Sequence, residues 1–90
     1  MKITSRFTVA VHTLLVINTF QDKVKTTSEF IASSVNVNPV VIRRTMQSLK
    51  AAGMIDVKAG SGGARLARRP EDITLFDVYS AVDSVEGDLF

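Results

Sequence analysis

The chain has 90 residues, of which 46% are hydrophobic and none is cysteine. This length suits one small domain, residues 1–90, and the absence of cysteine excludes disulfides, thiol catalysis and thiolate metal sites within it. No apolar run reaches the roughly 18 residues of a transmembrane helix, and His12 and Thr13 interrupt the apolar N-terminal stretch. We therefore expect a cytoplasmic protein with neither a signal peptide nor a membrane partner.

The charges are unevenly distributed along the chain. Residues 1–69 hold all eleven Lys and Arg with three acidic residues, a formal charge of +8, whereas residues 70–90 hold six acidic residues and no basic one. A basic body indicates a polyanionic partner such as nucleic acid. An uneven solvated surface would give the same pattern, so charge alone leaves both interpretations open.

The first predicted helix begins at Ser5, a favourable N-cap residue, and ends near Phe20. Its apolar residues recur at helical spacing and are Phe7, Ala10, Val11, Leu14, Leu15 and Ile17. A polar loop follows, in which residues 24–26 could form a short strand.

The second predicted helix begins at Thr26 or Thr27. Thr26 and Glu29 have the spacing of a capping box, in which each side chain satisfies a free backbone N–H group. Asn36 fits the end of this helix, because asparagine tolerates the left-handed conformation. The apolar contacts of the helix are expected from Phe30, Ile31 and Val35.

A third helix is predicted to follow at once. Asn38 caps it, Pro39 occupies its first position, where the missing N–H costs nothing, and Gly53 ends it. Its buried stripe is expected to consist of Ile42, Met46 and Leu49.

The rest of the chain predicts a hairpin and a last helix. Residues 54–58 alternate as in a strand, residues 59–63 are a glycine-rich turn, and residues 64–67 could form the returning strand. Thr74 and Asp77 have capping spacing for a helix whose apolar face would hold Leu75, Val78, Tyr79 and Val82.

This order of elements predicts the fold class. Two short helices joined by a three-residue turn and followed by a glycine-tipped hairpin are typical of a winged helix-turn-helix. We therefore expect a mainly helical α+β domain with a three-helix core, a two-stranded wing and a C-terminal helix. Ala32 is small, as the close crossing of two helices requires.

The outward face of the third helix is the candidate recognition surface. Arg43, Gln47 and Lys50 share one face, and Arg can bond guanine whereas Gln can pair with adenine. We expect base or groove-edge contacts from the N-terminal part of the helix and phosphate contacts from Gln47 and Lys50. The expected base contacts are Asn38, Val40, Arg43 and Arg44. An ordinary solvated basic face is the alternative interpretation.

The glycine-rich turn has two interpretations. As a wing, its glycines supply positive φ and let the backbone approach a phosphate, with Lys58 and Arg65 flanking the tip. The expected wing contacts are Lys58, Gly60, Ser61, Gly62, Gly63 and Arg65. As a nucleotide cradle, the turn would need a helix directly after it, but residues 64–67 are too short and lead into Pro70.

Catalytic chemistry has little support. His12 is the only histidine, and the sequence offers it no second histidine or cysteine for a metal cluster. The C-terminal carboxylates Asp77, Asp83, Glu86 and Asp88 are best explained as helix-capping charge and solvated surface. We therefore expect no enzyme, no catalytic residue and no metal site.

The chain resembles the Rrf-two family of bacterial winged-helix transcription regulators, and most closely its YwnA-like members. Its start, MKITSRFTVAVHTLL, and its centre, TTSEFIASSVNVNPVVIRRTMQSLKAAGMIDV, carry the resemblance together with the wing AGSGGARLAR and the following PEDITLFDVYSAV. The resemblance implies a homodimeric, sequence-specific DNA binder, usually a repressor. It implies contacts at Arg43 and Arg44, wing contacts over residues 58–63, and backbone contacts near Ser5 and Arg6.

The sequence departs from this family pattern in three ways. Ser61 replaces a proline common at the wing tip, which predicts a more mobile wing, and several relatives have acidic or amide residues in place of Arg43 and Arg44. Relatives generally continue into a long dimerisation helix, and some hold an iron–sulfur cluster on three cysteines. This sequence ends at Phe90 without either, so we expect no cofactor.

Pattern and resemblance together predict a transcription regulator that binds double-stranded DNA. A winged-helix module that binds only other proteins is the alternative, and the charge of +8 over residues 1–69 speaks against it.

Overall fold

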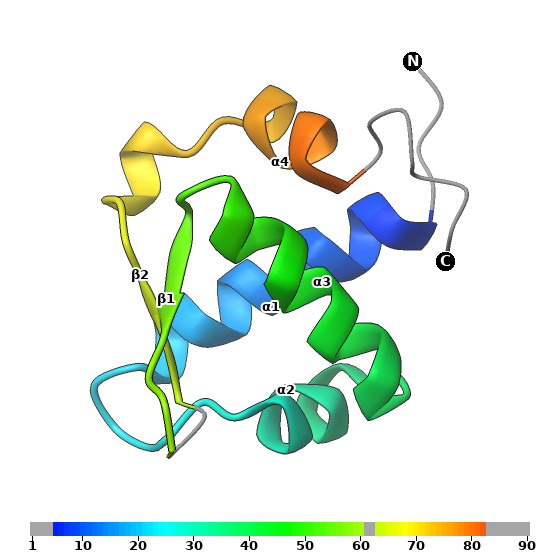
Figure 1. The fold of residues 1–90 in the computed structure, drawn as a ribbon, viewed down its shortest axis with the longest axis vertical. Coiled ribbons are helices and arrows are strands. Elements are labelled where there is room, and N and C mark those ends of the chain that lie inside the picture. Colours follow the sequence, from blue (N-terminus) through cyan, green and yellow to red (C-terminus); the bar gives the residue numbers. More distant parts are fainter. Residues whose placement is uncertain (1–4, 61–62, 83–90) are drawn as a thin grey trace.

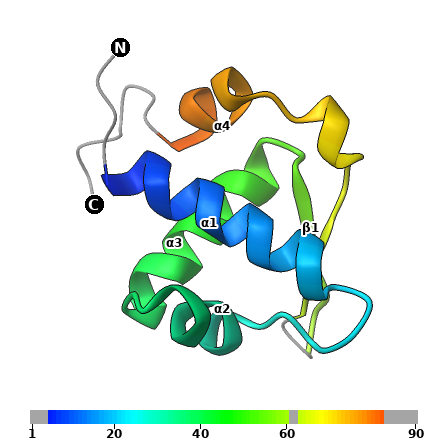
Figure 2. The same cartoon turned by 180° about the vertical axis from the view of Figure 1, so that it is seen from behind.

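The structure is a computed structural model that describes residues 5–60 and 63–82. In chain order the described elements are α1 (Ser5–Phe20), α2 (Ser28–Val35), α3 (Pro39–Ala51), β1 (Ile55–Val57), β2 (Ala64–Leu66), η1 (Pro70–Asp72) and α4 (Leu75–Val82). Figure 1 shows α3 crossing in front of α1, with α2 at one end of the molecule and α4 at the other. The view from behind shows α1 in front and α2 again at the end opposite α4 (Figure 2). No helix in the described ranges is long and apolar enough to cross a membrane.

The turn between α2 and α3 adopts the predicted geometry. Asn36 has φ 58° and ψ 50°, and the N–H of Val37 donates to the carbonyl of Ala32 at 3.0 Å. This six-to-one bond defines a Schellman ending, which needs a left-handed residue at that position. Asn38 then caps α3, because its Oδ1 accepts from the N–H of Val40 at 2.8 Å. Local hydrogen bonds therefore define both the end of α2 and the start of α3.

The end of α3 repeats the same device with glycine. Gly53 has φ +79°, its N–H donates to the carbonyl of Lys50, and the N–H of Met54 donates to that of Leu49, both at 3.0 Å. Arg68 secures this end, since its Nη2 donates to the carbonyl of Ala52 at 3.1 Å. The chain thus turns directly from α3 into β1.

The predicted capping box at Thr26 and Glu29 is wrong. Thr27 is the N-cap of α2, and its Oγ1 accepts from the N–H of Phe30 at 3.1 Å. Thr26 is buried instead: its Oγ1 donates to the carbonyl of Ala64 on β2, and its own carbonyl accepts from the N–H of Ala64 at 3.0 Å. Residues 24–26 therefore do not form the strand considered above, although Thr26 pairs with β2 at one point.

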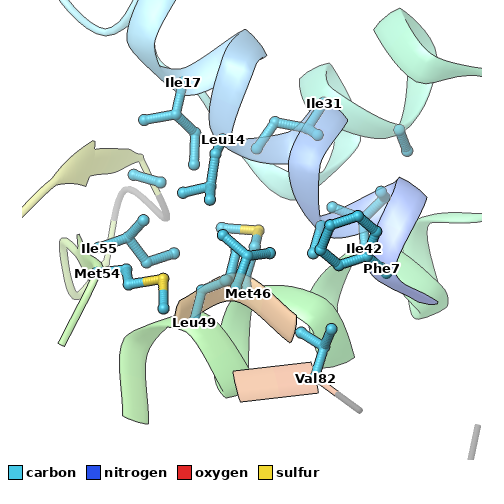
Figure 3. Packing of buried hydrophobic residues seen from close by; sticks show 14 residues of the cluster. Phe7, Leu14, Ile17, Ile31, Ile42, Met46, Leu49, Met54, Ile55 and Val82 are labelled. Atoms are coloured by element: carbon cyan, nitrogen blue, oxygen red, sulfur yellow. The ribbon is translucent and has the colours of Figure 1, made fainter. Parts of the chain in front are cut away.

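The hydrophobic core lies between α1, α2, α3, the hairpin and α4 (Figure 3). The stripe predicted for α3 is confirmed, since Ile42 and Leu49 have no exposed surface and Met46 is 5% exposed. Complete burial of side chains such as Ile42 and Leu49 contributes about 1.5–3 kcal/mol each. The other buried apolar residues are Phe7, Ala10, Leu14, Ile17, Ile31, Ala32, Met54, Ile55, Ala64, Val78 and Val82.

The last helix follows the prediction except at its first residue. Thr74 and Asp77 form the expected capping box, with each side chain accepting from the backbone N–H of the other residue at 3.0 and 3.1 Å. Val78 and Val82 are buried and Tyr79 is half-buried, but Leu75 is 65% exposed. Leu75 lies in the first turn, beyond the edge of the core, and lines a surface groove with Leu15 of α1.

Candidate nucleic-acid interface

The exposed face of α3 carries five of the six predicted recognition residues. Burying Ile42, Met46 and Leu49 directs the opposite side of the helix to solvent. Five predicted recognition residues are exposed on this helix: Val40, Arg43, Arg44, Gln47 and Lys50. Two arginines, a lysine and an amide on one face provide donors for both phosphates and base edges.

Asn38, the sixth, lies at the N-terminus of α3 and is exposed. Its Oδ1 is engaged in the cap with the N–H of Val40. An amide bound in this way accepts through its oxygen, so contact with DNA would use Nδ2 as a donor. Asn38 therefore caps α3, and its predicted contact with DNA must leave this cap intact.

Glu29 lies beside the recognition face, a position that no local pattern in the sequence predicts. It is in the first turn of α2, and its Oε2 is 3.6 Å from Nη1 of Arg43. It also lines a hollow between α2 and α3 together with Asn38 and Pro39. No other acidic residue occurs between Asp22 and Asp56 in the sequence, so Glu29 is the one carboxylate that α2 and α3 contribute.

The hairpin is built as a wing of short strands. β1 and β2 pair antiparallel with Asp56 opposite Arg65, and the N–H of Lys58 donates to the carbonyl of Gly63 at 2.9 Å to close the turn. Gly60 has φ +88°, the conformation for which glycine was predicted there. Ser61 and Gly62, also predicted wing contacts, lie outside the described residues. Figure 1 places the end of β1, the start of β2, α2 and the start of α3 at the same end of the molecule.

The guanidinium of Arg65 is bound to the loop after α1. Its Nη1 donates to the carbonyl of Gln21 at 2.9 Å, and its Nη2 lies 2.8 Å from Oδ1 of Asp22. These bonds connect it to the loop after α1, whereas Lys58 is exposed next to the turn. The predicted phosphate contact of Arg65 would therefore require it to share or exchange these partners.

Two lysines outside the predicted set face the same region. Lys23 and Lys25 of the loop after α1 line an open groove together with Lys58 and Arg65 of the hairpin. The loop was predicted only as a polar connection, because two lysines in a short loop do not indicate by themselves which surface they join. Ser5 and Arg6 belong to the first turn of α1. Figure 1 shows this end of α1 on the opposite side of α3 from the hairpin.

The described residues do not provide a metal site. No group of three or more His, Cys, Asp or Glu side chains in residues 5–60 and 63–82 is arranged to hold an ion. His12 is exposed on α1, and the sequence has no cysteine. This donor set does not fit iron, which proteins commonly bind through cysteine and histidine.

Comparison with known proteins gives a consistent family assignment. The proposed HTH-type transcriptional regulator YwnA of Bacillus subtilis (strain 168) is 48% identical over 84 residues, covering 93% of this chain and 61% of YwnA. A crystal structure of a proposed DNA-binding protein is 49% identical with a TM-score of 0.79, covering 89% of this chain and 66% of that one. CymR, the global cysteine regulator of B. subtilis, shares the fold at 22% identity and a TM-score of 0.81, covering 97% of this chain and 65% of CymR.

This chain spans less than two thirds of the length of each of these three relatives. The predicted winged helix-turn-helix fold and the predicted family are both confirmed, and these relatives are described as regulators or DNA-binding proteins rather than enzymes. The model of the Rrf2 (Rrf-two) family, described as an iron-dependent transcriptional regulator, matches residues 3–89. The chain belongs to the Rrf2 family of transcriptional regulators.

Proposed function

We propose that this chain is the sequence-specific DNA-binding domain of a transcriptional repressor and that it reads double-stranded DNA with α3. The observation that carries the proposal is the exposed face of α3, with Arg43, Arg44, Gln47 and Lys50 to solvent and an ordered cap at Asn38. A helix whose N-terminal residues project from the protein can enter the major groove and reach the base edges.

In this mechanism affinity and specificity come from different residues. Lys50 and Gln47 contact phosphates, as do Lys58, the backbone at Gly60 and Gly63, and the start of α1 at Ser5 and Arg6. Asn38, Val40, Arg43 and Arg44 reach the bases or the groove edge, where Arg gives bidentate bonds to guanine and Val40 can contact a thymine methyl group. Lys23 and Lys25 extend the phosphate-binding surface beside the wing.

The wing contributes through its backbone and its tip. Residues 58–63, which include the undescribed Ser61 and Gly62, would follow the sugar-phosphate backbone or enter the adjacent minor groove. Gly60 supports this role because its φ of +88° forms a narrow turn, and open space surrounds the position of a Cβ.

We further propose that the protein acts in the cytoplasm as a homodimer on two related half-sites, as the family resemblance implies.

In vitro selection of bound duplexes from a random pool tests these proposals together. Recovery of a single motif in two copies related by two-fold symmetry is the expected result. Enrichment of no motif would contradict sequence-specific binding, and enrichment of an isolated half-site would contradict dimeric binding.

A further inference from the structure

The outer edge of β2 is paired with the loop that follows α1. We call residues 21–26 the α1–α2 loop. The N–H of Ala64 donates to the carbonyl of Thr26 at 3.0 Å, and the N–H of Leu66 donates to Oε1 of Gln21 at 2.9 Å. Thr26 is buried and its Oγ1 donates back to the carbonyl of Ala64. Backbone groups of β2 that face away from β1 therefore find partners in this loop.

Arg65 adds a charged connection between the same two segments. It lies between Ala64 and Leu66, and its guanidinium contacts the carbonyl of Gln21 and the carboxylate of Asp22 at 2.9 and 2.8 Å. Asp56 lies directly opposite Arg65 in the register of the hairpin. The guanidinium nevertheless reaches across to the α1–α2 loop, so the loop and β2 are joined by main-chain and side-chain bonds together.

The hairpin needs such support because it is short. Each strand has three residues, and an isolated two-stranded hairpin is marginally stable in water. Burial of Ile55 and Ala64 holds the base of the hairpin in the core, and the contacts of its outer edge add to this support. A wing held in one direction avoids the entropic cost of being ordered when it meets DNA.

We infer that the α1–α2 loop is the anchor of the wing, and that Asp22 and Arg65 are positioning residues for DNA binding. This inference rests on the function proposed above. Arg65 acts in it by holding the wing rather than by contacting a phosphate. Asp22, although acidic, then favours the binding of a polyanion because it keeps Lys58 and the glycine turn in place.

The direction in which one substitution changes DNA affinity distinguishes this positioning role from a purely electrostatic one. Removing a negative charge near DNA strengthens binding when the charge acts only through its field. Removing Asp22 should instead weaken binding, because the wing loses its anchor. Asp56 supplies a matched control: it lines the same open groove as Asp22 and carries the same charge, but it does not belong to the anchor.

The test compares Asp22→Ala with Asp56→Ala in binding to a mixed-sequence DNA duplex over a range of salt concentrations. We expect Asp22→Ala to weaken binding about three- to tenfold, because the wing must now be ordered when DNA binds. The slope of log K against log salt should stay unchanged, because no phosphate contact is lost. Asp56→Ala should bind as tightly as the unaltered chain or more tightly. Equal or tighter binding by Asp22→Ala would overturn the inference.

Amide hydrogen exchange tests the anchor without DNA. The N–H groups of Ala64 and Leu66 should exchange faster in Asp22→Ala, whereas those of Met46 and Leu49 in the core should keep their protection. Unchanged exchange at Ala64 and Leu66 would overturn the anchor. Failure of the unaltered chain to bind any duplex at low salt would instead contradict the proposed function, and the exchange measurement would still decide the role of Asp22.

Discussion

Glu29 in α2 lies 3.6 Å from Arg43 on the exposed face of α3, so the residue proposed to read a base is paired with a carboxylate before DNA arrives. Both side chains are largely exposed, at 72% and 51%. An exposed pair of this kind is worth about 0–1 kcal/mol. The pair is weak enough for Arg43 to exchange it for guanine or phosphate. Breaking the pair costs free energy, so it disfavours DNA sequences on which Arg43 makes only weak contacts.

Replacing Glu29 with Gln should therefore relax discrimination. We expect affinity for a mixed-sequence duplex to rise about two- to fivefold, since the lost pair no longer competes for Arg43. The ratio of affinities for selected and mixed-sequence duplexes should fall. Parallel titrations of both duplexes measure this ratio, and Glu71→Gln in η1 provides the same charge change outside α2 and α3. The same ratio in Glu29→Gln and the unaltered chain would contradict the prediction.

Single alanine substitutions should separate base contacts from phosphate contacts on α3. Arg43→Ala and Arg44→Ala should each cost about 1–3 kcal/mol of binding free energy and relax the preference at one base position. Lys50→Ala should weaken binding to all sequences alike and make the slope of log K against log salt less steep by about one. Competition with duplexes altered at single positions measures both effects. An equal loss on every sequence would reassign that arginine to the backbone.

Asn36 should be replaceable by glycine but not by alanine. Its φ of 58° places it in the left-handed region, where an alanine side chain is strained by about 1 kcal/mol and glycine is not. Asn36→Ala should therefore lower the free energy of unfolding by about that amount, while Asn36→Gly should preserve or raise it. Urea denaturation of the two variants measures the difference. Equal stabilities would show that the turn does not depend on this conformation.

Acid should selectively weaken the start of α4. Hydrogen bonds from the backbone and side chain of Thr74, together with the charge of Arg68, hold the pKa of Asp77 below its ordinary value. A lowered pKa in the folded state stabilises the protein above the ordinary pKa, and this contribution disappears as the pH falls from about 4 through the lowered value. The stability difference between the unaltered chain and Asp77→Asn should therefore shrink over that range. A difference that is constant between neutral pH and pH 2 or so would contradict this assignment.

Local rules explain most of what the sequence could predict. Asn36, Asn38, Gly53 and the pair Thr74–Asp77 act through residues no more than a few positions away, so spacing alone identified their caps and turns. Spacing also predicted which face of α3 is exposed, because the apolar residues of its buried stripe recur at helical intervals.

The features that the sequence could not predict depend on distant partners. Thr26 has a favourable capping position, yet its hydroxyl bonds to Ala64, 38 residues later. Arg65 reaches Asp22, 43 residues earlier, rather than solvent at the wing. Only the fold brings these segments together, and a competing tertiary bond then prevails over the local preference. Glu29 likewise becomes part of the candidate interface only through the fold, because α2 packs beside α3.

The most direct test of the central claim is the affinity of the chain for a DNA duplex as a function of salt concentration. Each phosphate neutralised by lysine or arginine contributes about −0.9 to the slope of log K against log salt. The phosphate contacts proposed for Lys50, Lys58, Arg6, Lys23 and Lys25 predict a linear decrease with a slope of roughly −3 to −4.5, for three to five such contacts. A flat response, or no binding at low salt, would contradict the proposal that this surface binds DNA.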